Sequence, residues 1–552
     1  MLYLLLIALM ALPLAGTALA LIAEQVKPVR GLAEPLYLVP VAAALLLGLA
    51  LRPAQIELIF GDWSPVSFTG TPLILAANPG GISILIAIVA VMLLSPFTAR
   101  SAVGVGGSAN ENRARPLIAG ALFIALCITV LAYDMVTLLI GISLVDMAVA
   151  LNGLVQSRHA GRVLRDAFFH AASIGLLVIA IALYNVTGNS LYLPLAQIPE
   201  RLMPFFSTAL ALRLCLTPLR AASDLVTARS AVGNDNDWVD KASPAASLLL
   251  LSRLPQLGAP ELHAWFFAFA LLTAISALAL GALTARSPSG TVNRSRLQTS
   301  LSVGGLAIAV LSAVTWNSGI ITASAIAWIL GVSLVEFNTS SFGPQLRRVI
   351  LIPRLVGLLC IVGLPLTVGF IGRSGTITTW AERGLGGAAL IVGFALAQVL
   401  LTVCALRLLR WSDTPATHQR PITEVIRAIM LLAPVVLIVL YGLSPNLAGA
   451  PSFSSQLSHN GLLGWFLWLI TTIVGVAVWF TEGVWSKLIE TSRERISSVI
   501  GLGWWQDIMT GAIDRLSKPL HGVITFLDSD GALLWAIIVI LIVVLVSRPG
   551  GP

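Results

Sequence analysis

The chain has 552 residues, of which 57% are hydrophobic and only 11% charged, and its formal net charge is +8. A soluble domain carries roughly 25% charged residues, so this composition excludes an ordinary soluble protein. The sequence has no P-loop and no dinucleotide-binding fingerprint, and its four cysteines lie singly in apolar runs without metal-ligand spacing. We therefore expect no cofactor, no metal and no nucleic-acid partner, and we attribute the positive charge to loops beside a membrane.

Apolar runs of about 20 residues, the length that crosses a bilayer, recur along nearly the whole chain. The first run lacks a basic start and is followed by further spans, so we predict a retained helix and not a signal peptide. The sequence thus predicts an all-α polytopic membrane protein with about 14–16 transmembrane helices. The predicted spans are 1–23, 35–51, 75–97, 116–132, 135–156, 168–187, 203–219, 243–257, 263–284, 300–315, 318–337, 349–371, 385–409, 422–443, 462–481 and 532–547.

The basic residues between these spans are distributed asymmetrically. Nearly all of them, Lys241 included, lie in loops after odd-numbered spans, whereas loops after even-numbered spans contain only Arg52, Arg201 and Arg383. Lysine and arginine collect on the cytoplasmic side of a membrane. We therefore predict an integral protein of the bacterial inner membrane with its N-terminus outside the cytoplasm.

The segment 484–527 is amphipathic and is not a span. Apolar residues from Trp505 to Val523 follow helical spacing, with charged residues between them. This pattern predicts a lateral helix that lies along the bilayer surface or along a neighbouring subunit, and both alternatives stay open. A last span, 532–547, follows it.

Ionisable residues inside a membrane are costly, so each is a candidate for function. The ion-pathway candidates are Asp146, Arg213, Arg253, Glu336 and Arg373. For Arg253, and above all for Arg354, a long side chain that reaches the interface is the simpler interpretation. His170 and His263 lie near span ends without partners at ligand spacing, so we interpret them as satisfied or interfacial.

Two of the candidate arginines lie beside a proline. Arg213 precedes Pro218 in "LRLCLTPLR", and Arg373 follows Pro365 in "GLPLTVGFIGR". Proline breaks or kinks a helix, and broken helices in membranes usually line a polar cavity. Two such breaks predict two inverted repeats with discontinuous helices, which is typical of transporters.

The residues around the second break resemble a known family. "GLPLTVGFIGR", with helix-break residues Gly363, Pro365 and Gly369 before Arg373, resembles the broken twelfth helix of the antiporter-like membrane subunits of NADH-quinone oxidoreductase (complex I). The same family includes Mrp-type cation/proton antiporter subunits and membrane subunits of energy-converting hydrogenases. The resemblance implies a divergent member that conducts protons, or exchanges cations for protons, beside other membrane subunits of a complex.

Two other stretches extend this resemblance. "RLCLTPLR" resembles the family's broken seventh helix, with Arg213 in a lysine place, Pro218 kept and Arg220 in a histidine place. "SPAASLLLLSR" resembles the start of the eighth helix and places Arg253 near another family lysine. The implied organisation is N-terminal helices at 1–74, an antiporter-like core at 75–445, and an extension at 446–552.

The departures from the family pattern concern its proton carriers. Ser143 stands where the fifth helix carries glutamate, and Asp146, one turn later, either substitutes for it or is a coincidental cap. Glu336 in "VSLVE" falls near a family lysine of the eleventh helix. Arg213 and Arg373 replace lysines, and arginine does not release its proton at physiological pH.

Three functions follow as hypotheses. The first is a subunit of a complex I-like or Mrp-like assembly that translocates protons through half-channels. The second is a non-conducting structural or coupling subunit of such a complex. The third is a membrane partner for uptake of an anion or inorganic carbon. The sequence shows no catalytic site of its own, so any enzymatic role would be as a translocase subunit of an oxidoreductase-like complex.

Overall fold

A computed structural model of the whole chain provides the structure. It describes residues 2–25, 33–51, 56–60, 73–94, 109–155, 160–186, 195–214, 238–254, 260–284, 294–337, 344–409, 428–451 and 459–481. The predicted lateral helix at 484–527 and the last predicted span at 532–547 lie outside these residues, as does Pro218.

The described residues form helices and one two-stranded sheet. The α-helices are α1 (Leu2–Gln25), α2 (Ala33–Leu51), α3 (Pro79–Met92), α5 (Ala109–Leu131), α6 (Met135–Val155), α7 (Ala160–Val186), α8 (Met203–Arg213), α10 (Val239–Arg253), α11 (Pro260–Thr284), α12 (Arg294–Leu311), α13 (Ser318–Glu336), α14 (Pro344–Val362), α15 (Val368–Ala381), α16 (Gly384–Leu409), α18 (Leu432–Leu443) and α20 (His459–Phe480). Short 3-10 helices are η2 (Leu195–Gln197), η3 (Glu200–Leu202), η4 (Ser312–Thr315) and η5 (Pro445–Ala448), and the strands are β1 (Ile56–Phe60) and β2 (Leu73–Ala77).

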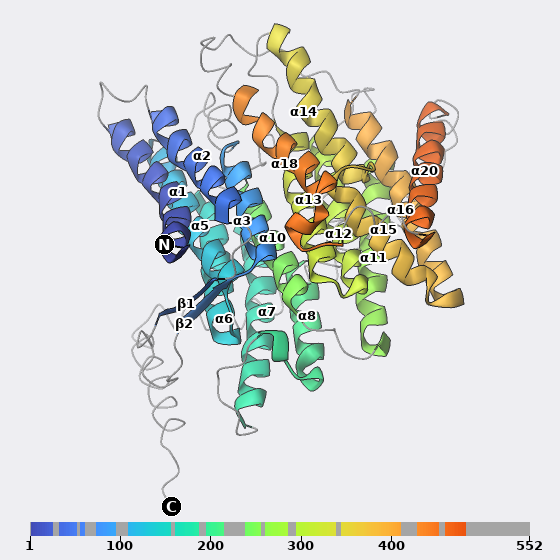
Figure 1. Cartoon of the computed structure of the whole chain (residues 1–552), viewed down its shortest axis with the longest axis horizontal. Helices are drawn as coiled ribbons and strands as arrows, with labels where there is room; N and C mark the ends of the chain where they lie inside the picture. Colours follow the sequence, from blue (N-terminus) through green and yellow to red (C-terminus); the bar gives the residue numbers. More distant parts are fainter. Residues whose placement is uncertain are drawn as a thin grey trace, which may run out of the picture.

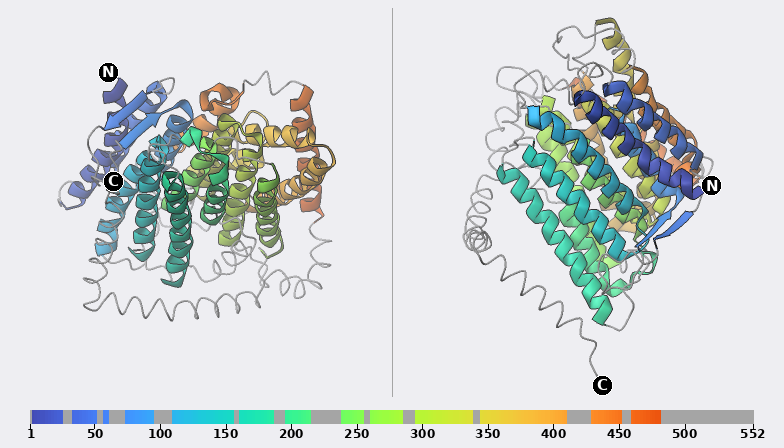
Figure 2. Two further views of the ribbon diagram at one scale, coloured as in Figure 1. Left: turned by 90° about the horizontal axis from the view of Figure 1, so that it is seen from below. Right: turned by 90° about the vertical axis from the view of Figure 1, so that its left-hand side faces the viewer.

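The helices form one elongated bundle, with α1 and α2 at one end and α16 and α20 at the other (Figure 1). The view from below shows the same succession along the bundle (Figure 2). Among the described residues, eight helices are long and apolar enough to cross a membrane, and five shorter apolar helices accompany them. The eight are Leu4–Ala23, Met135–Val155, Asp166–Tyr184, Ala264–Ala282, Leu297–Thr315, Ser318–Glu336, Gly386–Leu409 and Leu462–Phe480. The prediction of a helical polytopic membrane protein is confirmed.

The predicted span 75–97 is wrong at its start. Residues 73–77 form β2, which pairs antiparallel with β1 from Ile56 opposite Ala77 to Phe60 opposite Leu73. The helix begins only at Pro79, because the Asn78 side chain accepts a hydrogen bond from the Gly81 N–H and proline favours the first helical position. A short apolar run does not by itself distinguish a strand from a helix, which explains the error.

Two helices form the centre of the bundle. Every residue of α3 from Gly81 to Met92 is buried, and so is nearly every residue of α13. Both helices are apolar around most of their circumference, which is typical of a helix enclosed by protein. The Ser83 hydroxyl of α3 donates to the Leu447 carbonyl in η5 at 2.9 Å, so α3 contacts a segment far along the chain. By contrast, α20 exposes a row of large apolar side chains, including Phe466, Ile470 and Ile473.

Candidate functional site

Asp146 of α6 and Arg213 of α8 form a buried, two-point ion pair. Arg213 Nη1 lies 2.7 Å from Asp146 Oδ2, and Arg213 Nη2 lies 2.7 Å from Asp146 Oδ1. Arg213 is 1% exposed and Asp146 is 8% exposed. Two parallel charge-assisted hydrogen bonds fix both the distance and the orientation of the groups. Asp146 is therefore the carboxylate that meets the arginine in the seventh-helix lysine place.

Ser143, which stands in the glutamate place of the family pattern, does not make this contact. Its hydroxyl donates to the Leu139 carbonyl one turn earlier at 2.7 Å. Asp146 lies in the interior of α6 and pairs with Arg213, whereas Ser143 bonds only to its own helix. Arg213 itself ends α8, and Pro218 and Arg220 beyond it lie outside the described residues.

Two serines of α10 complete the surroundings of this pair. Arg213 Nη2 donates to Ser243 Oγ at 3.1 Å, and Arg213 Nε donates to Ser247 Oγ at 3.2 Å. Residues four apart share one face of a helix, so both hydroxyls point to the same partner. The Ser243 hydroxyl also lies 3.5 Å from Asp146 Oδ1. A buried guanidinium is stable only when its donors are satisfied, and these contacts satisfy them.

His170 of α7 joins the same cluster. Its Nδ1 lies 3.3 Å from Asp146 Oδ1, and the imidazole is 8% exposed. Of the two interpretations made from the sequence, satisfied or interfacial, the buried contact agrees with the first; its partner follows from how α6 and α7 pack and not from local spacing. Histidine is the side chain that most readily exchanges a proton near neutral pH. Asp146 thus lies between a permanent cation and a titratable group.

A second buried ion pair joins Lys241 of α10 to Glu336 of α13. Lys241 Nζ lies 2.6 Å from Glu336 Oε2 and 3.5 Å from Ser333 Oγ. Lys241 is 9% exposed and Glu336 is 7% exposed. Lys241 is also the only lysine within the described ranges. Glu336, predicted as a pathway candidate, therefore has a partner that sequence reasoning missed.

The assignment of Lys241 to a cytoplasmic loop is corrected by this contact. The predicted span began at residue 243, and so left Lys241 in the preceding loop. In the structure α10 begins at Val239 and contains Pro244 in its interior. The helix therefore carries Lys241 into the protein.

The two ion pairs lie on different sides of α10. This helix packs against α6 and α8, which supply Asp146 and Arg213, and against α13, which supplies Glu336. Ser243 contacts the first pair, while Lys241, two residues earlier, contacts the second. Residues two apart do not share a helix face. The two charged clusters therefore lie on different faces of α10, and this one short helix contacts both.

The predicted break after Gly363 is present. Helix α14 ends at Val362, Gly363 has a φ of 78°, and α15 begins at Val368 with Pro365 in the turn between them. At Gly369, an added Cβ would collide with the backbone carbonyl of Cys360, so glycine permits the close approach of the two half-helices.

The Arg373 side chain of α15 forms a hydrogen bond across this break to the end of α14. Its Nη1 donates to the Val362 carbonyl, at the C-terminal end of α14, and to Gln398 Oε1 of α16. Gln398 Nε2 donates to the same Val362 carbonyl. The last carbonyls of a helix lack intrahelical partners, and a cation is favoured at that end. Arg373 is therefore a partner of the broken helix, and it lies in neither ion pair.

We expect replacement of Gly363 by alanine to destabilise the protein. A φ of 78° disfavours any side chain by about 1–2 kcal/mol, and the new Cβ would also press on the Arg373 side chain. Gly386→Ala is the matched control, because Gly386 lies in α16 with open space around its Cβ position. Thermal unfolding in detergent should show a lower Tm for Gly363→Ala only. Equal Tm values would contradict the assigned backbone constraint.

Other arginines contact helix ends in the same way. Arg253 Nη1 donates to the Ala132 carbonyl just after α5, and Arg407 Nη1 donates to the Ala282 carbonyl in the last turn of α11. Arg354 Nη2 donates to the Leu408 carbonyl of α16 at 3.3 Å. Arg354 is 3% exposed, and the Leu408 carbonyl that it contacts lies in the last turn of α16. These arginines, Arg253 included, stabilise helix termini and lie apart from the two ion pairs.

Comparison with known proteins identifies the fold. No family model and no curated protein matches the sequence. Among solved structures, the Mrp complex from Dietzia sp. DQ12-45-1b matches over 100% of this chain with a TM-score of 0.66 and 17% identity. This chain spans 63% of the length of that Mrp chain.

Two respiratory complexes match as well. The archaeal membrane-bound sulfane sulfur reductase matches over 98% of this chain and 99% of its own, with a TM-score of 0.63 and 16% identity. Respiratory complex I from Thermus thermophilus matches over 85% of this chain and 99% of its own, with a TM-score of 0.56 and 16% identity. The chain is a polytopic membrane protein with the fold of membrane subunits of Mrp and complex I-type assemblies, as its helix-break motif predicted.

Proposed function

We propose that this chain is an ion-translocating membrane subunit of a multi-subunit Mrp-like or complex I-like assembly, and that the ion is the proton. The observation that carries the proposal is the cluster of His170, Asp146 and Arg213 inside a bundle of membrane helices. Intramembrane charges are expensive and rare, and those that pair in a protein interior typically mark an ion or proton route. The fold adds support, because the similar solved chains belong to assemblies of this kind.

Each residue has a distinct role in this proposal. His170 takes up and releases the proton near neutral pH, and the Asp146 carboxylate beside it is the group with which it exchanges the proton. Arg213 keeps its charge and holds the Asp146 carboxylate by two hydrogen bonds, so it positions this group without moving a proton itself. Lys241 and Glu336 form a second titratable pair on the far side of α10.

The arginines at helix ends take no part in this proposed route. Arg253 and Arg373 donate to backbone carbonyls, and arginine is a poor proton carrier. The sequence pattern alone would have placed both of them on the pathway. In this proposal the lysine positions at Arg253 and Arg373 have become structural, and Asp146, His170, Lys241 and Glu336 carry the chemistry.

The test is proton flux in liposomes that contain the purified assembly holding this chain. A potassium diffusion potential drives uptake, and a trapped pH-sensitive dye reports it. We expect Asp146→Asn to reduce flux to the level of protein-free liposomes, because the amide keeps the shape of the carboxylate and cannot ionise. The matched control is Asp134→Asn. Asp134 is also buried, but its carboxylate caps α6 through the Thr137 N–H at 2.8 Å, and asparagine caps a helix equally well.

The outcomes separate the alternatives. Flux that is lost in Asp146→Asn and kept in Asp134→Asn supports the proposal. Flux that both variants keep would place the route elsewhere. An inactive wild-type assembly would replace the proposal with the non-conducting structural subunit, which the substitution of arginine for lysine at Arg213 and Arg373 would then explain. Uptake of an anion without protons would favour the third hypothesis.

A further inference from the structure

Arg373 is a buried cation without a carboxylate partner among the described residues. It is 8% exposed, and its two hydrogen-bond acceptors, the Val362 carbonyl and Gln398 Oε1, are both neutral. Arg213 and Lys241, by contrast, each meet a carboxylate. A buried charge that lacks an opposite charge is strongly disfavoured in a protein interior. The dipole at the end of α14 offsets only part of the charge of Arg373.

A small cavity lies directly beside Arg373. It has a volume of about 20 Å³ and is enclosed by α12, α13, α14 and α15. Its polar lining consists of Arg373, the hydroxyl-bearing Ser324 and the thiol of Cys360. A volume of roughly 10–15 Å³ accommodates one water-sized species. The cavity therefore has room for a single small ion or water next to the guanidinium.

The groups around this cavity favour a negative charge. Gly369 and Gly372 line it from the first two turns of α15, so the cavity lies near the positive end of that helix dipole. The α15 N-terminus lacks a side-chain cap, because the Thr367 hydroxyl donates backwards to the Leu364 carbonyl at 2.6 Å. Arginine has donors only, and two of its nitrogens, Nε and Nη2, have no acceptor among the described residues.

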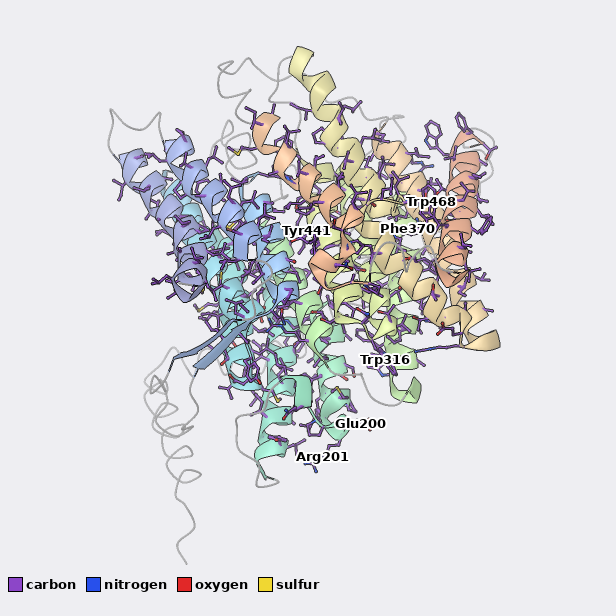
Figure 3. The ribbon with its side chains drawn as sticks, in the orientation of Figure 1. Glu200, Arg201, Trp316, Phe370, Tyr441 and Trp468 are labelled. Atoms are coloured by element: carbon purple, nitrogen blue, oxygen red, sulfur yellow. The ribbon has the colours of Figure 1, made fainter. Side chains whose placement is uncertain are left out.

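A second, smaller cavity of about 10 Å³ also touches Arg373. Phe370 and Trp468, labelled in Figure 3, line it from α15 and α20. The indole N–H of Trp468 is buried and has no acceptor within the described ranges. This cavity is at the lower limit for a water molecule, so it is the poorer place for an ion.

We propose that the larger cavity is a chloride site, in which Arg373 and the first turn of α15 hold a single halide ion. The proposal does not depend on proton translocation. The cavity volume selects a monatomic anion, since bicarbonate and other polyatomic anions have several heavy atoms and the space takes one water-sized species. No described carboxylate pairs with Arg373, and the bound chloride provides the opposite charge in its place. The ion therefore stabilises the broken helix.

The experiment measures the Tm of the full chain in detergent as sodium chloride replaces sodium gluconate at constant ionic strength. A ligand that binds only the folded state raises stability with the logarithm of its concentration above Kd. We expect a saturable rise in Tm with chloride, a similar rise with bromide, and none with bicarbonate. A wild-type Tm that is the same in both salts would overturn the proposal.

Two variants locate the site. Arg373→Gln should abolish the chloride response. Gly305→Ala should do the same while folding normally, because its new methyl group enters the cavity and meets its nearest neighbours, Trp328 and Ile361, at ordinary contact distances of 3.4 and 3.7 Å. Gly305→Ala thus keeps the test decisive if Arg373→Gln does not fold.

Two controls complete the design. Arg354→Gln removes another buried arginine that contacts a helix-end carbonyl, and it should keep the full chloride response. Trp468→Phe removes a donor from the smaller cavity and should also keep the response. A response that all variants retain would reveal a general salt effect. A chloride response lost only in Trp468→Phe would place the ion in the smaller cavity and contradict the proposal.

Discussion

Replacing Arg213 by methionine should destabilise the protein by about 3–5 kcal/mol, the usual cost of leaving one member of a buried ion pair without its partner. Asp146, which is 8% exposed in the wild-type protein, would lose both of its charge-assisted hydrogen bonds. Ser243 and Ser247 would also lose their donor. The measurement is the free energy of unfolding, or the Tm, of the single variant in detergent.

The double variant Arg213→Met with Asp146→Leu tests whether the lost stability comes from the unpaired carboxylate. Replacing both members of a buried ion pair by apolar residues of similar volume is often nearly neutral. We therefore expect the double variant to recover most of the stability lost in Arg213→Met. A double variant that is less stable than the single one would show that the pair itself, and not the orphaned charge, supplies the stability.

The second large effect concerns Lys241. Lys241→Met should also cost about 3–5 kcal/mol, because it leaves the Glu336 carboxylate buried without its cation. A matched control is Arg201→Met, since Arg201 lies exposed in η3 on the surface of the bundle (Figure 3). A surface substitution usually changes stability by about 0.5 kcal/mol or less. Thermal unfolding of the two variants should differ clearly.

The Lys241 prediction also tests the corrected position of that residue. If Lys241 lay in a loop, its replacement would behave like that of Arg201. Adding Glu336→Leu to Lys241→Met should restore stability, because no buried charge then remains unpaired. Equal stability of Lys241→Met and Arg201→Met would contradict the buried pair.

The sequence predicted the features that depend on local chemistry. Apolar runs predicted the helices, and a helix is present in each predicted span within the described residues. The pattern of glycine and proline around Gly363 predicted the break, because a positive φ and a missing N–H are properties of those residues themselves. Asp146 and Glu336 were found because an ionisable group in an apolar run is conspicuous.

The partners of these groups could not be predicted in the same way. His170 meets Asp146, and Lys241 meets Glu336, only through the packing of helices that are distant in the sequence. The charge of an arginine likewise does not indicate whether it meets a carboxylate, as Arg213 does, or a helix-end carbonyl, as Arg253 and Arg373 do. One signal for Lys241 was nevertheless present in the sequence: lysine is absent from nearly all of the chain, and that scarcity could have marked Lys241 as a candidate.

The buried position of α3 has a consequence for biogenesis. The Ser83 hydroxyl of this helix bonds to a carbonyl 364 residues later in the chain, and α13 and α18 also pack against α3. At a synthesis rate of about 5–20 residues per second, the partner of Ser83 emerges from the ribosome roughly 20–70 s after α3. During that interval lipid must cover the side of α3 that protein later encloses. The segment of α3 from Ile82 to Met92 contains no charged residue. Contact between α3 and lipid is therefore of low free energy until the second half of the chain packs against this helix.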